Sequence, residues 1–171
     1  MLPGDSAAAA KLARKHDDKL KGGAWTKSDG ARPLRYAVEI RHPSFMVPEF
    51  FSLLRRHNIA FVFADTAGKW PYVEDLTADF VYCRLHGAEE LYVSGYTAQA
   101  LDWWAARIGY WRRGIQPRDA KLVSNLKAKP GRRDIYVYFD NDVKVHAPFN
   151  ANDLANKFGI SPLLATPPPR Q

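Results

Sequence analysis

The stretch Phe80-Val-Tyr-Cys-Arg-Leu-His-Gly87 decides how the rest of the chain is interpreted. Side chains alternate across a β-strand, so this stretch predicts a strand with two different faces. The apolar face consists of Val81, Cys83 and Leu85. The other face consists of Phe80, Tyr82, Arg84 and His86. It begins aromatic and becomes cationic toward the carboxyl end, where Gly87 ends the predicted strand.

Three further stretches, residues 34–41, 59–66 and 134–142, are also predicted to be strands. Each of them brings ionisable side chains to its carboxyl end. Together with the first stretch, these side chains are Glu39, Arg41, Asp65, Arg84, His86, Asp140 and Asp142. A sheet that serves only as a core does not need charges at one common edge, so this convergence indicates a functional site.

Helical segments are expected between and around the strands. Asp5 or Ser6 can cap a helix that runs toward Leu20, and Thr97 can cap a later one. Pro48 suits a first helical turn, and Asn150 is predicted to cap the last helix. Strands that alternate with helices predict an α/β fold with parallel strands.

The strand faces distinguish between two parallel architectures. A doubly wound sheet has helices on both sides, so both strand faces should be apolar. Three of the predicted strands instead have one apolar face and one face of aromatic and charged residues, which favours a barrel with helices outside. Four strands cannot close a barrel of eight, so we expect an incomplete barrel of about four βα units within residues 1–160. Residues 161–171, rich in proline, are expected to form a flexible tail.

Composition narrows the class of protein. The chain has 171 residues, 46% of them hydrophobic, which indicates a folded domain. A single cysteine allows no internal disulfide and fits a reducing cytoplasm. No apolar run approaches the roughly 20 residues that span a membrane, and the first residues lack the layout of a signal peptide. We therefore expect a cytoplasmic protein that has no membrane partner.

The candidate site follows from the charged strand ends. Carboxylates and imidazole are suited to proton transfer, and arginine to binding an anion. The predicted catalytic residues are Glu39, His86 and Asp140. The predicted substrate-binding residues are Arg41, His42, Asp65, Arg84, Tyr96, Tyr138 and Asn141. The competing interpretation is structural: ion pairs that fill a barrel, a satisfied histidine, and a turn shaped by His42.

A metal is not assigned, because the chain lacks the tight His and Cys spacing of a zinc site. A divalent cation remains a candidate through the oxygen ligands of Glu39, Asp65 and Asp140, together with His86. No other cofactor is indicated, since there is no glycine-rich phosphate loop.

A net charge of +7 and the basic segment 112–133 raise a second possibility, a nucleic-acid-binding or scaffold protein. This segment connects a predicted helix back to a strand, so it should lie opposite the carboxylate-bearing edge.

Several motifs, in order along the chain, resemble the YecE-like family, domain of unknown function 72. They are Arg35-Tyr-Ala-Val-Glu-Ile-Arg-His-Pro-Ser44, Phe63-Ala-Asp-Thr66, Asp75-Leu-Thr-Ala-Asp-Phe-Val-Tyr-Cys-Arg-Leu-His-Gly87, Ser94-Gly-Tyr96 and Tyr136-Val-Tyr-Phe-Asp-Asn-Asp142. The resemblance implies a TIM-barrel-like fold and no established activity. Family members are longer, so the chain resembles the carboxyl-terminal half of a barrel. Three interpretations follow: a truncated reading frame, a fragment, or a half that pairs with another half. A truncated chain could be inactive.

A half barrel leaves two sheet edges unpaired, at residues 34–41 and 134–142. Unpaired edge strands invite association with other chains. We therefore expect self-association through these edges, in addition to an unidentified small-molecule ligand.

Overall fold

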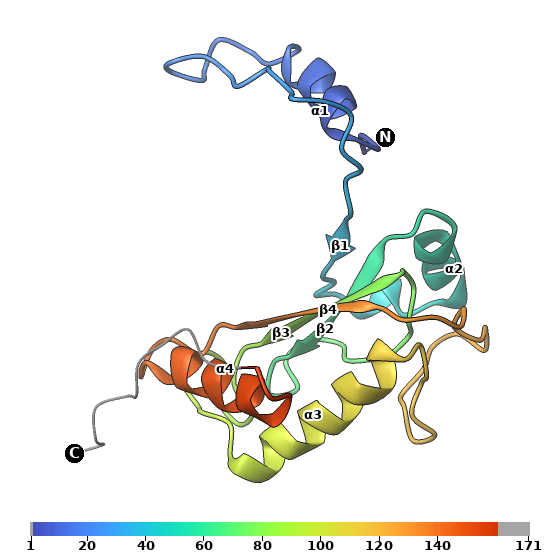
Figure 1. Ribbon diagram of the computed structural model, residues 1–171, viewed down its shortest axis with the longest axis vertical. Coiled ribbons are helices and arrows are strands. Elements are labelled where there is room, and N and C mark those ends of the chain that lie inside the picture. Colours follow the sequence, from blue (N-terminus) through green and yellow to red (C-terminus); the bar gives the residue numbers. More distant parts are fainter. Residues whose placement is uncertain (1, 161–171) are drawn as a thin grey trace. The chain divides into compact units, whose positions relative to one another are not determined.

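The computed structural model describes residues 2–160, which belong to two compact units, Met1–Tyr36 and Ala37–Gln171 (Figure 1). The predicted tail, residues 161–171, lies outside the described residues.

The amino-terminal unit contains one helix, α1 (Ser6–Ala13). The carboxylate of Asp5 accepts a 2.7 Å hydrogen bond from the Ala8 amide, so the predicted cap is confirmed. The helix does not extend toward Leu20, as the sequence predicted. Residues 14–19 are almost all charged and exposed. They therefore have no apolar face whose packing would stabilise further turns of the helix.

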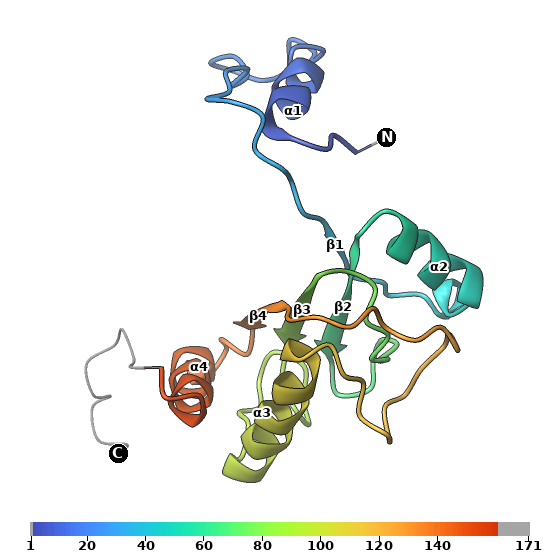
Figure 2. The same cartoon turned by 45° about the vertical axis from the view of Figure 1, so that its right-hand side comes forward.

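Four parallel strands form one sheet in the order β1-β2-β3-β4 (Figures 1 and 2). Their bounds are β1 (Ala37–Val38), β2 (Ala60–Asp65), β3 (Phe80–Leu85) and β4 (Asp134–Phe139). The predicted α/β fold with parallel strands is confirmed. β1 and β4 stand at the two ends of the sheet, and both are shorter than predicted.

The helices of this unit are the 3₁₀ turn η1 (Pro43–Phe45), α2 (Pro48–Arg56), α3 (Ala98–Arg112) and α4 (His146–Lys157). In both ribbon views α3 and α4 lie next to each other on one side of the strands (Figures 1 and 2). They share a core with the predicted apolar face of β3, where Cys83 and Leu85 are fully buried. Trp111 of α3 and Phe51 of α2 are also fully buried in this core. One face of the sheet is therefore the helix-facing side.

The opposite face of the sheet, which we call the open face, carries the aromatic side chains of β3 and β4. Phe80 forms a small buried cluster with Ala60 and Ala78, against which Tyr82 packs. Farther along β4, Tyr138 is 50% exposed. The two faces predicted for residues 80–87 are therefore both present, and charge gathers on the open one.

Asn150 does not cap the last helix, which begins at His146. It is buried inside α4, and its side-chain oxygen accepts hydrogen bonds from the Tyr96 amide at 3.1 Å and from Asn141 at 2.9 Å. The residue is thus needed as a partner for a distant loop, a role that local sequence does not reveal.

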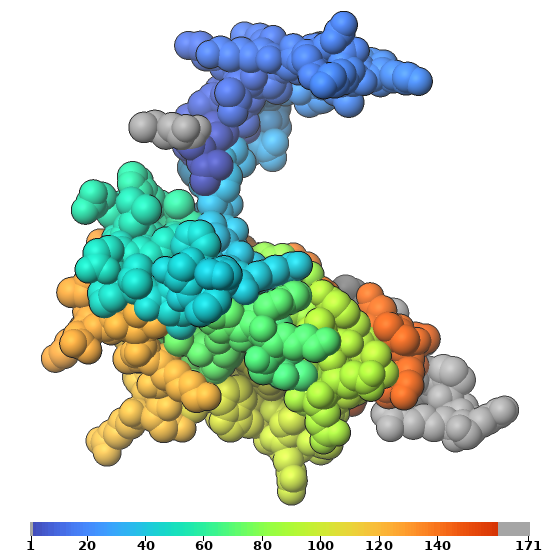
Figure 3. Space-filling view, turned by 180° about the vertical axis from the view of Figure 1, so that it is seen from behind, coloured from blue at the N-terminus to red at the C-terminus, as the bar shows by residue number. Residues whose placement is uncertain are grey.

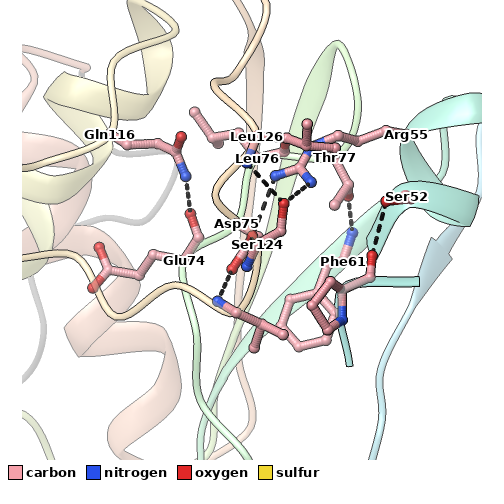
Figure 4. A network of polar contacts seen from close by, with 12 residues as sticks. Ser52, Arg55, Phe61, Glu74, Asp75, Leu76, Thr77, Gln116, Ser124 and Leu126 are labelled. Atoms are coloured by element: carbon pink, nitrogen blue, oxygen red, sulfur yellow. Dashed lines mark hydrogen bonds and ion pairs between the residues drawn. The ribbon is translucent and has the colours of Figure 1, made fainter. Parts of the chain in front are cut away.

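A second buried polar network fixes the loop before β3 (Figure 4). Asp75 is fully buried, and its carboxylate accepts hydrogen bonds from the amides of Val123 at 2.8 Å and Ser124 at 3.1 Å. Arg55 of α2 pairs with the same carboxylate at 3.2 Å and donates to the Ser124 hydroxyl at 2.6 Å. Asp75 therefore holds three distant segments together: α2, the loop before β3 and the connection between α3 and β4.

We expect Asp75→Asn to lower the free energy of unfolding by about 2–4 kcal/mol. The new side-chain NH2 group would face a backbone N–H of Val123 or Ser124, and Arg55 would lose its counter-charge. Urea unfolding at pH 7 measures this loss. Asp153→Asn, on the exposed side of α4, is the matched control and should leave stability essentially unchanged. Equal stabilities for the two variants would contradict the role given to Asp75.

Candidate functional site

A cluster of ionic side chains lies at the carboxyl end of the open face. Glu39 comes just after β1, Arg84 lies in β3 and Asp140 comes just after β4. Arg84 pairs in register with Ala64 of β2 and with Tyr138 of β4. Because alanine is short, the Arg84 side chain can pass over β2 and reach Glu39 on the far side.

Arg84 joins the two carboxylates. Its Nη1 donates to Glu39 Oε2 at 2.9 Å, and its Nη2 donates to Asp140 Oδ2. One guanidinium thus connects residues from the two outermost strand ends of the sheet, and neither carboxylate is left as an uncompensated charge.

His86 lies behind this ion cluster and is fully buried. Its Nδ1 is 3.0 Å from Asp140 Oδ2, and its Nε2 is 3.5 Å from Glu39 Oε2. Neither ring nitrogen forms a well-aligned hydrogen bond. The ring meets Trp70 and Tyr92 nearly perpendicular to their planes, with centroids 5.5 and 5.2 Å away. The imidazole is therefore enclosed by aromatic rings and directed toward two carboxylates.

Arg41 forms the outer, exposed part of the cluster. Its Nε donates to Glu39 Oε1 at 3.1 Å, and its guanidinium lies 4.1 Å from the centre of the Trp70 ring. Within residues 2–160, Arg41 forms its ion pair with the carboxylate of Glu39. The neighbouring His42 is exposed, and its Nδ1 accepts a hydrogen bond from the Ser44 amide at 3.2 Å, which caps η1.

The ion cluster keeps Glu39 and Arg84 charged. Burial raises the pKa of Glu39, but the hydrogen bond from Arg41 and the charge of Arg84 outweigh burial and bring this pKa below its ordinary value. Burial lowers the pKa of Arg84, and the charges of Glu39 and Asp140 more than reverse that effect. Glu39 and Arg84 are therefore both ionised at neutral pH.

A hollow of about 490 Å³ opens on the same face beside these charges. Its lining consists of Ala37, Glu39, Val62, Tyr82, Arg84, Tyr138 and Asp140. The rings of Tyr82 and Tyr138 are stacked, with centroids 5.0 Å apart and planes 17° apart. The hollow therefore combines a flat aromatic wall with a charged end.

The structure does not bring Asp65 and Tyr96 into this cluster. Asp65 shares the helix-facing side with Phe61 and Phe63, and the hydroxyl of Tyr96 donates to its carboxylate at 3.0 Å. The same hydroxyl accepts from the Gly87 amide at 3.1 Å. The alternation of β2 already contained this signal, because Asp65 is two residues beyond Phe63.

Asn141 is also separate from the ion cluster. It is fully buried and donates to Ser94 O at 3.0 Å and to Asn150 at 2.9 Å. Its contacts attach the loop after β3 to α4.

Trp70, Tyr92 and Ala64 contribute to the cluster and were not among the predicted site residues. Trp70 supports both Arg41 and His86, but it comes from a loop without periodicity. Ala64 gives Arg84 its route to Glu39, and its position on the open face of β2 was the available signal.

Within residues 2–160, no group of three or more His, Cys, Asp and Glu side chains is arranged to hold a metal ion. In the predicted set of ligands, Asp65 is on the opposite face of the sheet from Glu39 and Asp140.

Comparison with known proteins shows which family the chain belongs to. A model of the family described as "Protein of unknown function DUF72" matches residues 12–171. The chain belongs to the DUF72 family. A solved DUF72 family protein from Thermotoga maritima is similar, with 26% identity, a TM-score of 0.59, and coverage of 75% of this chain and 47% of that one.

A second solved DUF72 protein, from Enterococcus faecalis, shares the fold at 16% identity, with a TM-score of 0.57 and coverage of 96% of this chain and 56% of that one. The chain thus spans about half the length of these solved structures. No curated protein matches it. In the described part of the chain, no helix is both long and apolar enough to cross a membrane.

We expect Arg84→Met to destabilise the protein by about 1–3 kcal/mol at pH 7, because Glu39 and Asp140 would lose their shared counter-charge. Without Arg84, the pKa of Glu39 should rise, because both the charge and the hydrogen bond of Arg84 hold it down in the wild-type protein. The loss relative to wild type should therefore be largest at neutral pH and should shrink as the pH falls through the ordinary range of Glu39.

Urea unfolding of both proteins at pH 7 and pH 4 measures this difference. Arg56→Met, at the exposed end of α2, is the matched control. A difference in stability that is independent of pH would contradict the electrostatic role of Arg84.

Proposed function

We propose that the open face of the sheet lines the interior of a TIM-barrel-like domain to which this chain contributes about four βα units. Helices cover only the other face within residues 37–160, and the open face combines aromatic and charged side chains. The coverage of about half of each solved DUF72 chain agrees with such a partial contribution.

The function that the geometry supports best is an enzyme-like site for a polar small molecule with an anionic group, at the carboxyl end of this face. The observation that carries this proposal is the fully buried His86, whose two nitrogens face Glu39 and Asp140 beside an exposed arginine. A carboxylate and an imidazole in proximity are the usual components of proton transfer.

The anion is assigned mainly to Arg41. Arg84 is already engaged by two carboxylates, whereas Arg41 uses its Nε for Glu39 and is exposed. Its stacking on Trp70 fixes the guanidinium plane, so less side-chain freedom is lost when a ligand binds. A ligand held by Arg41 could place its body against the stacked Tyr82 and Tyr138.

Proton exchange is assigned to Asp140 with His86 behind it. Asp140 lines the hollow, while His86 is covered and lies 3.0 Å from the Asp140 carboxylate. A substrate in the hollow would therefore meet the carboxylate first, with the imidazole directly behind it. A divalent cation is not required, because the Arg84 guanidinium already supplies positive charge between the two carboxylates.

The basic connection between α3 and β4 favours a second candidate, nucleic-acid binding. It lies at the surface and projects from it, shown in gold and orange in Figure 3. Its exposed cations are Arg113, Arg118, Lys121, Lys127, Lys129 and Arg132, and Arg112 at the end of α3 adjoins them. Arg133 differs, because it is buried and donates hydrogen bonds to the carbonyls of Ala78, Lys129 and Gly131.

The first proposal predicts stabilisation by small anions. Phosphate, sulfate and citrate are added separately, and the melting temperature is measured. An anion present at 100 times its dissociation constant should stabilise the protein by about 2.7 kcal/mol, or roughly 5–10 °C. Arg41→Met should abolish the shift, while Arg56→Met should retain it. The same shift in Arg41→Met as in wild type would reject Arg41 as the residue that binds the anion.

The second candidate predicts DNA or RNA affinity that falls with salt. Replacing Lys127, Lys129 and Arg132 by glutamine should reduce the slope of log K against log salt by about 0.9 for each phosphate of duplex DNA that is no longer neutralised. Arg133 is left intact because it supports the backbone. An unchanged slope, or no binding at low salt, would exclude this segment as a nucleic-acid interface.

A further inference from the structure

A second hollow, on the helix-facing side, belongs neither to the ion cluster nor to the basic segment. It has a volume of about 380 Å³, within the range of small-molecule sites. Its lining consists of Asp65, Tyr72, Ala88, Tyr96, Ala100, Trp103 and Trp104. We call it the aromatic hollow.

Aromatic rings form most of the wall of the aromatic hollow. Trp104 packs edge-on against Trp103 and Tyr72, with centroids 5.1 and 6.2 Å away. Ala88 and Ala100 contribute only methyl groups, so space remains between the rings. Indole and phenol faces carry negative electrostatic potential and attract organic cations.

Asp65 adds a carboxylate to this wall. In residues 2–160 no lysine or arginine nitrogen lies within ion-pair distance of it, unlike Glu39, Asp75 and Asp140, which are all paired with arginine. Burial raises the pKa of Asp65. Hydrogen bonds from Tyr96, the Ala67 amide and Trp104, together with the charge of His86, oppose this only in part. A cation in the hollow would supply the missing counter-charge.

Tyr72 contributes its ring to the wall of the hollow, while its hydroxyl is enclosed. This hydroxyl has no hydrogen-bond partner among the described residues, although such groups are normally satisfied. The Tyr96 hydroxyl, by contrast, both donates to Asp65 and accepts from Gly87. The carboxylate of Asp65 is therefore the charged group that lines the hollow among aromatic rings.

We propose that the aromatic hollow binds a small organic cation, such as a substituted ammonium group, with its charge against Asp65 and its alkyl groups against the Trp and Tyr rings. A sugar suits the hollow less well, because its several hydroxyls would need more polar partners than Asp65 provides. The assignment does not depend on the site proposed on the open face.

Choline and its neutral isostere 3,3-dimethyl-1-butanol test the proposal by titration of tryptophan fluorescence. Choline should saturate the signal, and the neutral isostere should bind at least about tenfold more weakly because charge contributes to binding. Asp65→Asn keeps an acceptor for Tyr96 and should weaken choline binding about tenfold or more, while leaving the affinity for the isostere unchanged.

Ala100→Leu should abolish choline binding by filling the hollow. Gln99→Leu, at the neighbouring exposed position of α3, is the matched control and should bind like wild type. Circular dichroism and thermal melting establish that each variant is folded. Equal affinities for choline and the isostere, unchanged choline binding in Asp65→Asn, or no choline binding to the wild-type protein would each overturn the proposal.

Discussion

The charged edge of this sheet depends on a single arginine. Arg84 lies in β3, yet it bonds to Glu39 beyond β1 and to Asp140 beyond β4. Three charges can be withdrawn from water at this edge only because each faces an opposite charge. Ala64 makes the arrangement possible, since a larger side chain on β2 would block the path between Arg84 and Glu39.

Asp75 serves the loop before β3 in a comparable way. Its fully buried carboxylate accepts hydrogen bonds from Arg55 and from two backbone amides in the connection between α3 and β4. The two networks differ in exposure: the Asp75 network is largely enclosed, whereas the Arg84 network borders a hollow. This difference is the physical reason to regard the first as structural and the second as a candidate site.

Strand alternation divides the possible chemistry between two faces. Glu39, Arg84 and Asp140 are on the open face, while Asp65 is on the helix-facing side, where aromatic residues of α3 surround it. A paired carboxylate beside an arginine suits an anionic ligand, and an unpaired carboxylate among indoles suits a cation. The two proposed sites therefore differ in electrostatic preference.

Local sequence was enough to predict the parallel α/β class, the two faces of β3 and the cap at Thr97. These features follow from periodicity and from local backbone preferences, which act over a few residues. Only the tertiary structure decided which charges meet. Arg84 finds its partners 45 and 56 residues away, and Asn150 is a buried partner of Tyr96 instead of a cap because packing brings residues 54 apart together. Asp65 lies on the helix-facing side, because the register of β2 places each side chain on one face of the sheet regardless of its charge.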